Sequence, residues 1–134
     1  MILADTNVML RIFLRDDAAQ LKAVWAYVDR AARDHQSLLV HELSIAEMVW
    51  VLDRKGWSRE QIVDSLLELC ADPHFIVRDE EVVKAALAFF LEANVSFIDA
   101  FQGAYANAHG LKGILSFDRG FDGLGVRRID PKGN

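Results

Sequence analysis

Short apolar runs alternate along this chain with longer segments in which apolar residues recur at helical spacing. The short runs are MILA, SLLV, FIV, GILSF and VRRI, at residues 1–4, 37–40, 75–77, 113–117 and 126–129. Between them lie stripes such as Leu21, Val24 and Val28, which have the period of an α-helix with one buried face. Apolar strands that alternate with helices predict an α/β fold, with a central, mainly parallel sheet flanked by helices on both faces.

Serine residues that precede an acidic or amide side chain by three positions indicate where helices begin. SIAE at Ser44–Glu47 and SREQ at Ser58–Gln61 both fit a capping box, and Ser96 precedes Asp99 in the same pattern. No repeat, low-complexity tract or linker rich in Pro, Gly or Ser divides the sequence. We therefore expect residues 1–134 to form a single domain.

Two of the expected helices are apolar on more than one face. LSIAEMVWVL, at residues 43–52, has only two polar side chains, and AALAFFL, at residues 85–91, has none. A helix that covers its own sheet should be polar on its outer side. We expect a second buried face against another subunit or a partner chain, with Trp50, Phe89 or Phe90 as candidates. The alternative is tight packing between these helices within one monomer.

Composition limits the classes of function. The formal net charge is −5, and 52% of the residues are hydrophobic. No apolar run approaches the ~20 residues of a membrane-spanning helix, so we expect no membrane association. The acidic balance argues against a nucleic-acid clamp held by broad positive charge, but it is compatible with an acidic site neutralised by metal. A single cysteine cannot form an internal disulfide, which favours the cytoplasm.

Four carboxylates are singled out because apolar residues lie on both sides of them in their local stretches. Asp5 in ILADTN and Asp118 in ILSFDRGF fall at the carboxyl ends of expected strands. Glu47 in SIAEMVW and Asp99 in SFIDAFQ fall in the first turns of expected helices. In a parallel α/β domain, strand carboxyl ends and the helix starts that follow them share one edge of the sheet. All four side chains can therefore converge.

Each of these carboxylates also has a local explanation. Asp5 could cap the helix that begins near Asn7, and Asp118 could stabilise the DRG turn. Glu47 could complete the capping box, and Asp99 could be a favourable charge in a first helical turn. The sequence alone leaves these alternatives open.

A divalent cation would remove the repulsion among four carboxylates at one edge. Carboxylate oxygens suit Mg²⁺ or Mn²⁺. The four histidines are scattered without HxxxH or HxH spacing, and one cysteine cannot build a zinc site. No GxGxxG, P-loop or GxSxG pattern supports a dinucleotide, nucleotide or serine-nucleophile site.

The stretches DTNVML, LSIAEMVWVL, FIDAFQGAYANAHG and ILSFDRGF resemble, in order and spacing, the PIN-domain nucleases. The likeness is particularly to the VapC-type toxins of bacterial toxin–antitoxin pairs, and it runs from residue 1 to about residue 129. It implies a single PIN-like domain and a ribonuclease that depends on Mg²⁺ or Mn²⁺. The acidic quartet of the family falls on Asp5, Glu47, Asp99 and Asp118.

The resemblance also implies roles for individual residues. Asp5 and Asp99 would be the principal metal ligands, joined by Asp118. The small polar residues Thr6, Asn7 and Ser116 would orient the carboxylates; the family often has threonine at the position of Ser116, and serine keeps the hydroxyl. Glu47 or Asp118 would position the attacking water or accept its proton. Displacement of the ribose 3′ oxygen would then leave 5′-phosphate and 3′-hydroxyl ends.

Expected partners are RNA, an antitoxin that lies over the apolar helices and blocks the metal site, and a second copy of the chain in a homodimer. Several cations are candidates for phosphate contacts, although solvated surface charge is the better explanation for each one taken singly: Arg11, Arg15, Arg54, Lys55, Arg59 and Arg119. Asp122 is a candidate carboxylate at the rim of the site.

Three other functions remain as alternatives. The first is a signalling module phosphorylated on aspartate, for which Asp53 is the nearest acceptor, although it follows a helical stretch. The second is a noncatalytic relative that binds RNA or protein without cleaving. The third is a PIN-type RNA-processing nuclease that has no antitoxin.

Overall fold

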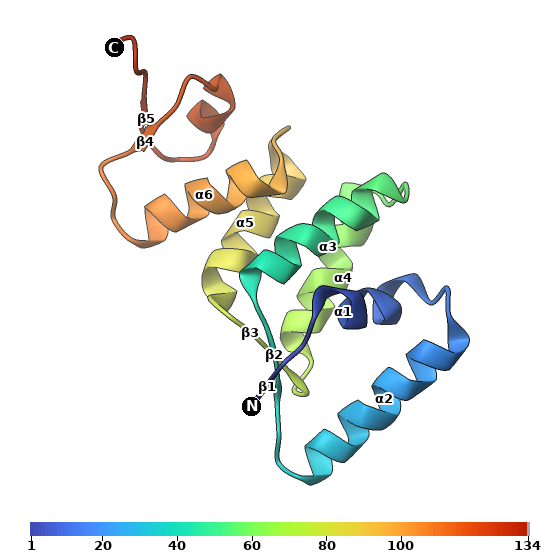
Figure 1. Ribbon diagram of the computed structural model, residues 1–134. Coiled ribbons are helices and arrows are strands. Elements are labelled where there is room, and N and C mark those ends of the chain that lie inside the picture. The colour runs from blue at the N-terminus through green and yellow to red at the C-terminus, as the bar shows by residue number, and fades with distance from the viewer. Residues whose placement is uncertain (134) are drawn as a thin grey trace. The chain divides into compact units, whose positions relative to one another are not determined.

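The chain divides into two compact units in the computed structural model, which describes residues 1–133 (Figure 1). Unit 1 comprises residues 1–80, and unit 2 comprises residues 81–134. The elements of unit 1 are β1 (Ile2–Leu3), α1 (Thr6–Leu14), α2 (Ala18–Arg33), β2 (Leu38–Val40), α3 (Glu42–Arg54), α4 (Arg59–Ala71) and β3 (Phe75–Val77). Those of unit 2 are α5 (Glu80–Glu92), α6 (Phe97–Ala108), β4 (Ile114–Leu115), the 3₁₀ helix η1 (Arg119–Gly123) and β5 (Arg128–Ile129).

Unit 1 is built on a parallel three-stranded sheet with the order β1–β2–β3. Leu38 of β2 is in register with Ile2 on one side and with Phe75 on the other. Because the strands are parallel, their carboxyl ends lie at one edge of the sheet. The residues that follow the strands at this edge are Asp5, His41 and Arg78.

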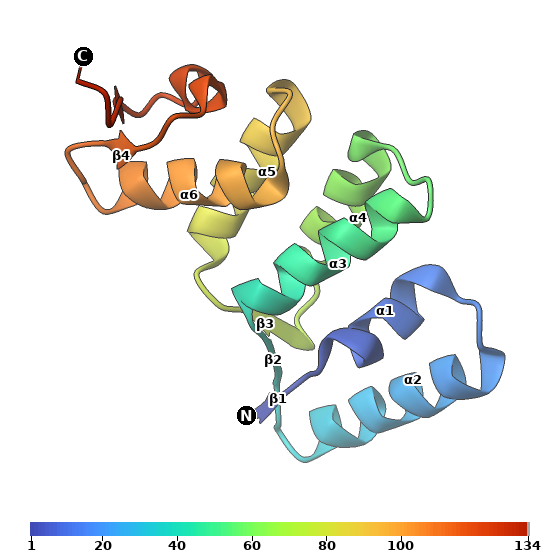
Figure 2. The same ribbon diagram turned by 45° about the horizontal axis from the view of Figure 1, so that its top comes forward.

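One face of this sheet forms the core of unit 1. Leu38, Val40, Phe75 and Val77 are buried, and the ring of Trp25 from α2 packs edge-on against Phe75 with centroids 6.4 Å apart. The helices pack in neighbouring pairs, α1 with α2 and with α3, and α3 with α4 (Figure 2). Their fully buried side chains include Met9, Val28, Ile45, Met48, Leu52, Ile62 and Leu66.

Unit 2 combines two helices with a second parallel ladder. Ile114 of β4 is in register with Arg128 of β5, and η1 lies in the connection between these strands. Gly103 of α6 lies so close to Leu124 that an added Cβ would be 3.0 Å from the leucine Cδ1. The rings of Phe90 and Phe97 pack edge-on between α5 and α6.

The α/β class, the expected strands and their parallel pairing are confirmed. The ladders form one three-stranded and one two-stranded sheet, where the sequence pattern had grouped all strands into one central sheet. Within residues 1–133, no helix is long and apolar enough to cross a membrane.

The helix starts agree with the capping motifs in two of three cases. Ser58 and Gln61 form the predicted capping box, and Ser96 Oγ accepts the N–H of Asp99 at 3.2 Å. The predicted start at Ser44 is wrong, because α3 begins at Glu42. Its N-cap is His41, whose Nδ1 accepts the N–H of Leu43 at 3.0 Å. A ring nitrogen thus replaces the side-chain oxygen of an ordinary N-cap.

The two apolar helices differ in what they expose. On α3, the side chains of Leu43 and Trp50 are 72% and 61% exposed. On α5, Phe89 is half-buried, whereas Phe90 is only 3% exposed. Phe90 therefore belongs to the core of unit 2, and the expectation that it could form an intermolecular interface is wrong.

Candidate active site

Asp5 caps α1 at the carboxyl end of β1. The ladder ends where the N–H of Ala4 donates to the carbonyl of Leu39, and the Oδ2 of Asp5 then accepts the N–H of Asn7 at 3.1 Å. The local explanation of Asp5 as a helix cap is thus confirmed. The side chain is exposed, so its carboxylate is oriented by α1 while remaining accessible to a ligand.

Glu47 lies in the second turn of α3 because the helix starts at Glu42. The capping-box explanation for Glu47 is therefore wrong: Ser44 is inside the helix and does not cap it. Glu47 is exposed, and within residues 1–133 no hydrogen-bond or ion-pair partner holds its carboxylate. A helix-bound carboxylate without a structural partner remains available to accept a proton.

Asp99 occupies the first turn of α6 and is partly buried. Its backbone N–H is bound by the Ser96 cap, so the helix-start position expected from the sequence is confirmed. Burial raises the pKa of the Asp99 carboxyl group, and the negative charge of Asp118 raises it further, whereas a hydrogen bond with Ser96 acts in the opposite direction. Asp99 and Asp118 are therefore brought close enough in unit 2 to repel each other.

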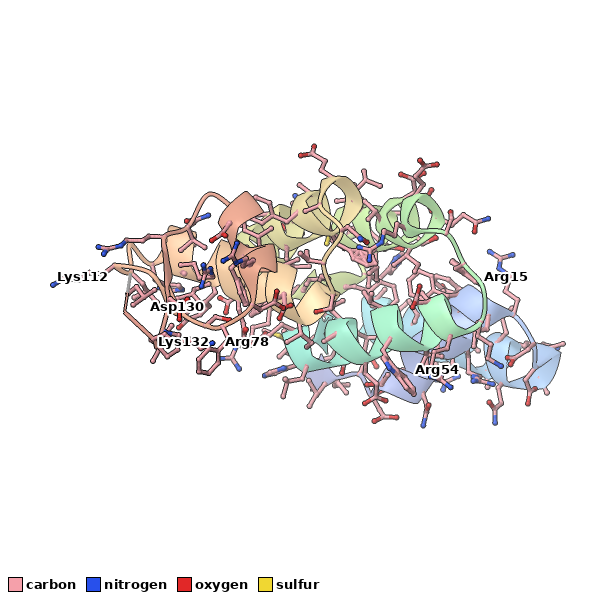
Figure 3. The ribbon with its side chains drawn as sticks, turned by 90° about the horizontal axis from the view of Figure 1, so that it is seen from above. Arg15, Arg54, Arg78, Lys112, Asp130 and Lys132 are labelled. Carbon is pink, nitrogen blue, oxygen red and sulfur yellow. The ribbon has the colours of Figure 1, made fainter. Side chains whose placement is uncertain are left out.

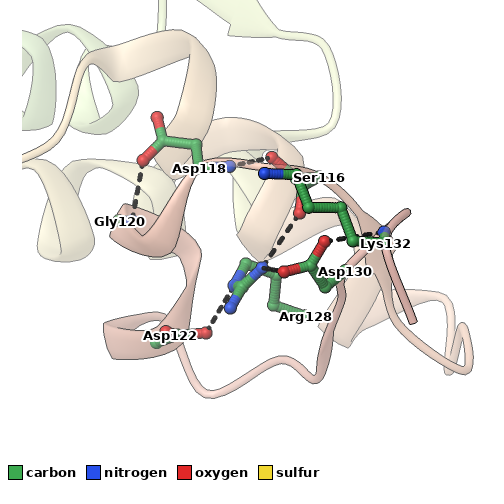
Figure 4. A network of polar contacts seen from close by, with 7 residues as sticks. All are labelled: Ser116, Asp118, Gly120, Asp122, Arg128, Asp130 and Lys132. Atoms are coloured by element: carbon green, nitrogen blue, oxygen red, sulfur yellow. Dashed lines mark hydrogen bonds and ion pairs between the residues drawn. The ribbon is translucent and has the colours of Figure 1, made fainter. Parts of the chain in front are cut away.

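Asp118 follows β4 in a tight turn (Figure 4). Its N–H donates to Ser116 Oγ at 2.9 Å, and its Oδ1 accepts the N–H of Gly120 at 2.8 Å. A Cβ on Gly120 would be 3.1 Å from that same carboxylate oxygen and 3.3 Å from Val95 Cγ1. The turn role predicted from DRG is confirmed, and glycine is the residue that allows this close approach.

Two of the residues expected to orient the carboxylates form hydrogen bonds with Asp5 or Asp118. Asn7 holds Asp5 by its main-chain N–H, and Ser116 binds the main-chain N–H of Asp118. Thr6 is buried, with 7% of its surface exposed. The carboxylates of Asp5 and Asp118 are thus fixed by local turns, which leaves oxygen atoms for a metal ion.

The donor chemistry of unit 2 fits a divalent cation. A raised carboxyl pKa caused in part by a second carboxylate is a mark of uncompensated negative charge, and oxygen ligands suit Mg²⁺ or Mn²⁺. Within either unit, among residues 1–133, no three His, Cys, Asp or Glu side chains come together as a metal cage.

A polar cluster that sequence reasoning missed follows β2 and β3. Nη1 of Arg78 lies 2.9 Å from His41 Nε2, and its Nε lies 3.8 Å from Glu42 Oε1. The other oxygen of Glu42, Oε2, is buried without a hydrogen-bond partner. Arg78 places a cation at the same sheet edge as Asp5. No motif indicates this cluster, because Arg78 lies 37 positions from His41 in the sequence.

Among the predicted phosphate contacts, Arg11 and Arg54 are engaged within the chain. Nη1 of Arg11 binds Asp16 at 3.0 Å. Arg54 is the last residue of α3 (Figure 3), and its guanidinium lies 4.8 Å from the ring centroid of Trp50. Arg119, next to Asp118, is exposed. Asp122, the expected rim carboxylate, binds Nε of Arg128 at 2.9 Å.

Comparison with known proteins decides the family, because the family model of the PIN domain matches residues 2–126. The chain belongs to the PIN domain family. A VapC ribonuclease from Aquifex aeolicus (strain VF5) is 26% identical over 132 residues, which cover 98% of this chain and 97% of that protein. No solved structure gives a significant match.

The match extends over most of both units of this PIN domain protein. All four acidic residues singled out in the sequence lie within the matched residues: Asp5, Glu47, Asp99 and Asp118. In unit 2 the charge of Asp118 contributes to the raised pKa of Asp99, and in unit 1 Asp5 caps α1 and Glu47 lies within α3.

Proposed function

We propose that this chain is a metal-dependent endoribonuclease and the toxin of a toxin–antitoxin pair. The observation that carries the proposal is the Asp99–Asp118 carboxylate pair, found in a chain that the PIN domain matches from residue 2 to 126. The likeness to a VapC ribonuclease over almost the whole of both proteins supports RNA as the substrate. We place its activity in the cytoplasm, where RNA is available.

The catalytic site of this proposal is one cluster within a single PIN-like domain of residues 1–134. Asp5, Asp99 and Asp118 bind Mg²⁺ or Mn²⁺, and Glu47 completes the acidic quartet. The continuous family match supports one shared site, since it runs through all four positions.

The bound ion would offset the negative charge of the phosphodiester and lower the pKa of a water molecule. The chain itself has two tasks. Asp5 and Asp118, fixed by the N–H groups of Asn7 and Gly120, present oriented oxygens. Glu47, which has no partner within the described residues, accepts the proton of the attacking water. The ribose 3′ oxygen leaves, which gives 5′-phosphate and 3′-hydroxyl ends.

The exposed apolar residues of α3 support a protein partner. Leu43 and Trp50 flank Glu47 on the same helix and are largely exposed. We assign this surface to the interface with a second copy of the chain, and we propose that the antitoxin covers the neighbouring catalytic edge. Burial of both side chains would remove a large apolar area from water.

Cleavage of RNA by partner-free protein tests the function. Total cellular RNA is incubated with the purified chain in Mg²⁺, Mn²⁺ or EDTA, beside Asp99→Asn and the control Asp64→Asn on the exposed side of α4. We expect cutting by the wild type and the control in either metal, none in EDTA, and a loss of about a hundredfold or more in Asp99→Asn. Cutting that persists in EDTA, or a folded wild-type protein that cuts no RNA, would contradict the proposal.

A further inference from the structure

The guanidinium of Arg128 joins three segments of unit 2. Its side chain, on β5, is only 10% exposed. Nε donates to Asp122 Oδ1 of η1 at 2.9 Å, and Nη1 donates to the carbonyl oxygen of Ser116, just after β4, at 3.1 Å. Nη1 also lies 3.6 Å from Asp130 Oδ2, beyond the end of β5 (Figure 4).

These contacts hold both ends of the turn that carries Asp118. On one side, the carbonyl oxygen of Ser116 accepts a hydrogen bond from Arg128, and the Oγ of Ser116 accepts the N–H of Asp118. On the other side, η1 contains both Asp122, which Arg128 binds, and Gly120, whose N–H binds Asp118 Oδ1. The planar guanidinium of Arg128 therefore connects the segment before the Asp118 turn with the segment after it.

Stability alone is a weak reason for an arginine at this place. The Arg128 side chain is 10% exposed but that of Asp122 is 54% exposed, and an ion pair with a solvent-exposed partner contributes little to stability. The register neighbour of Arg128 is the apolar Ile114, and Ile129 follows it on the same strand. Only a guanidinium offers several donors in a fixed planar geometry that can bind a carbonyl and two carboxylates together.

We propose that Arg128 is a positioning residue that aims the Asp118 carboxylate toward the metal ligands. It acts through Ser116 and η1, and it does not touch substrate. The inference rests on the proposed function, because it takes Asp118 to be a metal ligand. It also gives Asp122 a different role from the rim carboxylate expected from the sequence: Asp122 fixes the arginine.

Arg128→Met, Arg128→Lys and Asp122→Asn test this role. Arg127→Met is the matched control, since Arg127 is the adjacent exposed arginine on the same connection. Val83→Ala, in the core of α5, lowers stability without touching the turn. Each variant is examined by thermal unfolding, by Mn²⁺ binding without RNA using electron paramagnetic resonance, and by kcat and KM on an RNA oligonucleotide.

We expect Arg128→Met to weaken Mn²⁺ binding and to lower kcat by about tenfold to a hundredfold, the range for groups that orient metal ligands. KM for RNA should stay within about twofold, because no substrate contact is lost. Arg128→Lys keeps the charge but not the planar geometry, so it should recover only part of the loss. Arg127→Met and Val83→Ala should keep wild-type Mn²⁺ affinity.

Wild-type Mn²⁺ affinity and kcat in a folded Arg128→Met protein would overturn the inference. If that variant does not fold, Asp122→Asn and Arg128→Lys decide: losses in both affinity and kcat support the inference, and unchanged values in both variants refute it. An equal loss in Val83→Ala would also refute it, because the effect would then follow stability. A wild-type protein that neither binds Mn²⁺ nor cuts RNA would refute the proposed function, and this inference with it.

Discussion

Burial and the negative charge of Asp118 together raise the pKa of the Asp99 carboxyl group. The repulsion acts between the first turn of α6, which carries Asp99, and the turn after β4, which carries Asp118. The two carboxylates therefore form a region of excess negative charge. A protein gains no stability from such an arrangement, whereas a metal-binding protein uses it to attract a cation.

Removal of the Asp99 charge should stabilise the metal-free protein at neutral pH. Because the folded-state pKa is raised above the ordinary value of 3.8, the contribution of Asp99 to stability is fully present below that value. It is lost as the pH rises through the raised pKa. Urea unfolding of Asp99→Asn in EDTA should therefore give a higher midpoint than wild type at pH 7 and no such gain at pH 3 to 4. A lower midpoint at pH 7 would contradict the repulsion.

Divalent metal should reverse that order of stability. A ligand that binds only the folded state stabilises it by about 2.7 kcal/mol at a hundredfold excess over its Kd. Thermal unfolding with and without Mn²⁺ should show a higher Tm for the wild type and a much smaller rise for Asp99→Asn. Asp64→Asn serves as the control and should respond like the wild type. Equal rises in all three proteins would place Mn²⁺ binding elsewhere.

Two serines should differ in their effect on stability although both precede an acidic residue by three positions. Ser96→Ala removes the cap of α6 and should lower the free energy of unfolding by about 1 kcal/mol. Ser44→Ala lies inside α3, so its effect should stay within about 0.5 kcal/mol. Urea unfolding compares the two variants. A large loss in Ser44→Ala would mean that α3 starts at Ser44 after all.

Trp50→Glu should separate subunits without unfolding them. The side chain is 61% exposed, so its replacement removes little core packing, and the free energy of unfolding of the monomer should change by about 0.5 kcal/mol or less. Sedimentation velocity should find a dimer for the wild type and a monomer for the variant. Phe89→Glu, on the other apolar helix, is a useful comparison. A variant that sediments as the wild type does would remove Trp50 from the interface.

The sequence predicted the strands and the carboxylate-bearing turns because both are local features. A short apolar run predicts a strand wherever it occurs, and DRG predicts the turn at Asp118 whatever lies around it. The predicted start of α3 was wrong because Ser44 and Glu47 fit the capping-box pattern. In the structure, an imidazole nitrogen of His41 caps the helix instead. Both patterns are local, and only the structure distinguishes them.

Contacts between distant residues could not be predicted in this way. Arg128 binds Ser116 and Asp122, which lie 12 and 6 positions earlier in the sequence, and no local motif indicates either contact. Arg78 and His41 are 37 positions apart and meet because β2 and β3 are neighbours in the sheet. The sequence around Phe90 likewise predicted an apolar surface but not what covers it. In the structure, the ring of Phe97 from the same unit packs against Phe90.

In the proposed function, Asp5 and Asp99 are ligands of the same metal ion. Mn²⁺ binding by the RNA-free protein, measured by electron paramagnetic resonance for wild type, Asp5→Asn and Asp99→Asn, tests it directly. The account predicts that each substitution weakens binding by about tenfold or more, since each removes a ligand from the same site. Wild-type Mn²⁺ affinity in Asp5→Asn, with binding lost in Asp99→Asn, would contradict the shared site.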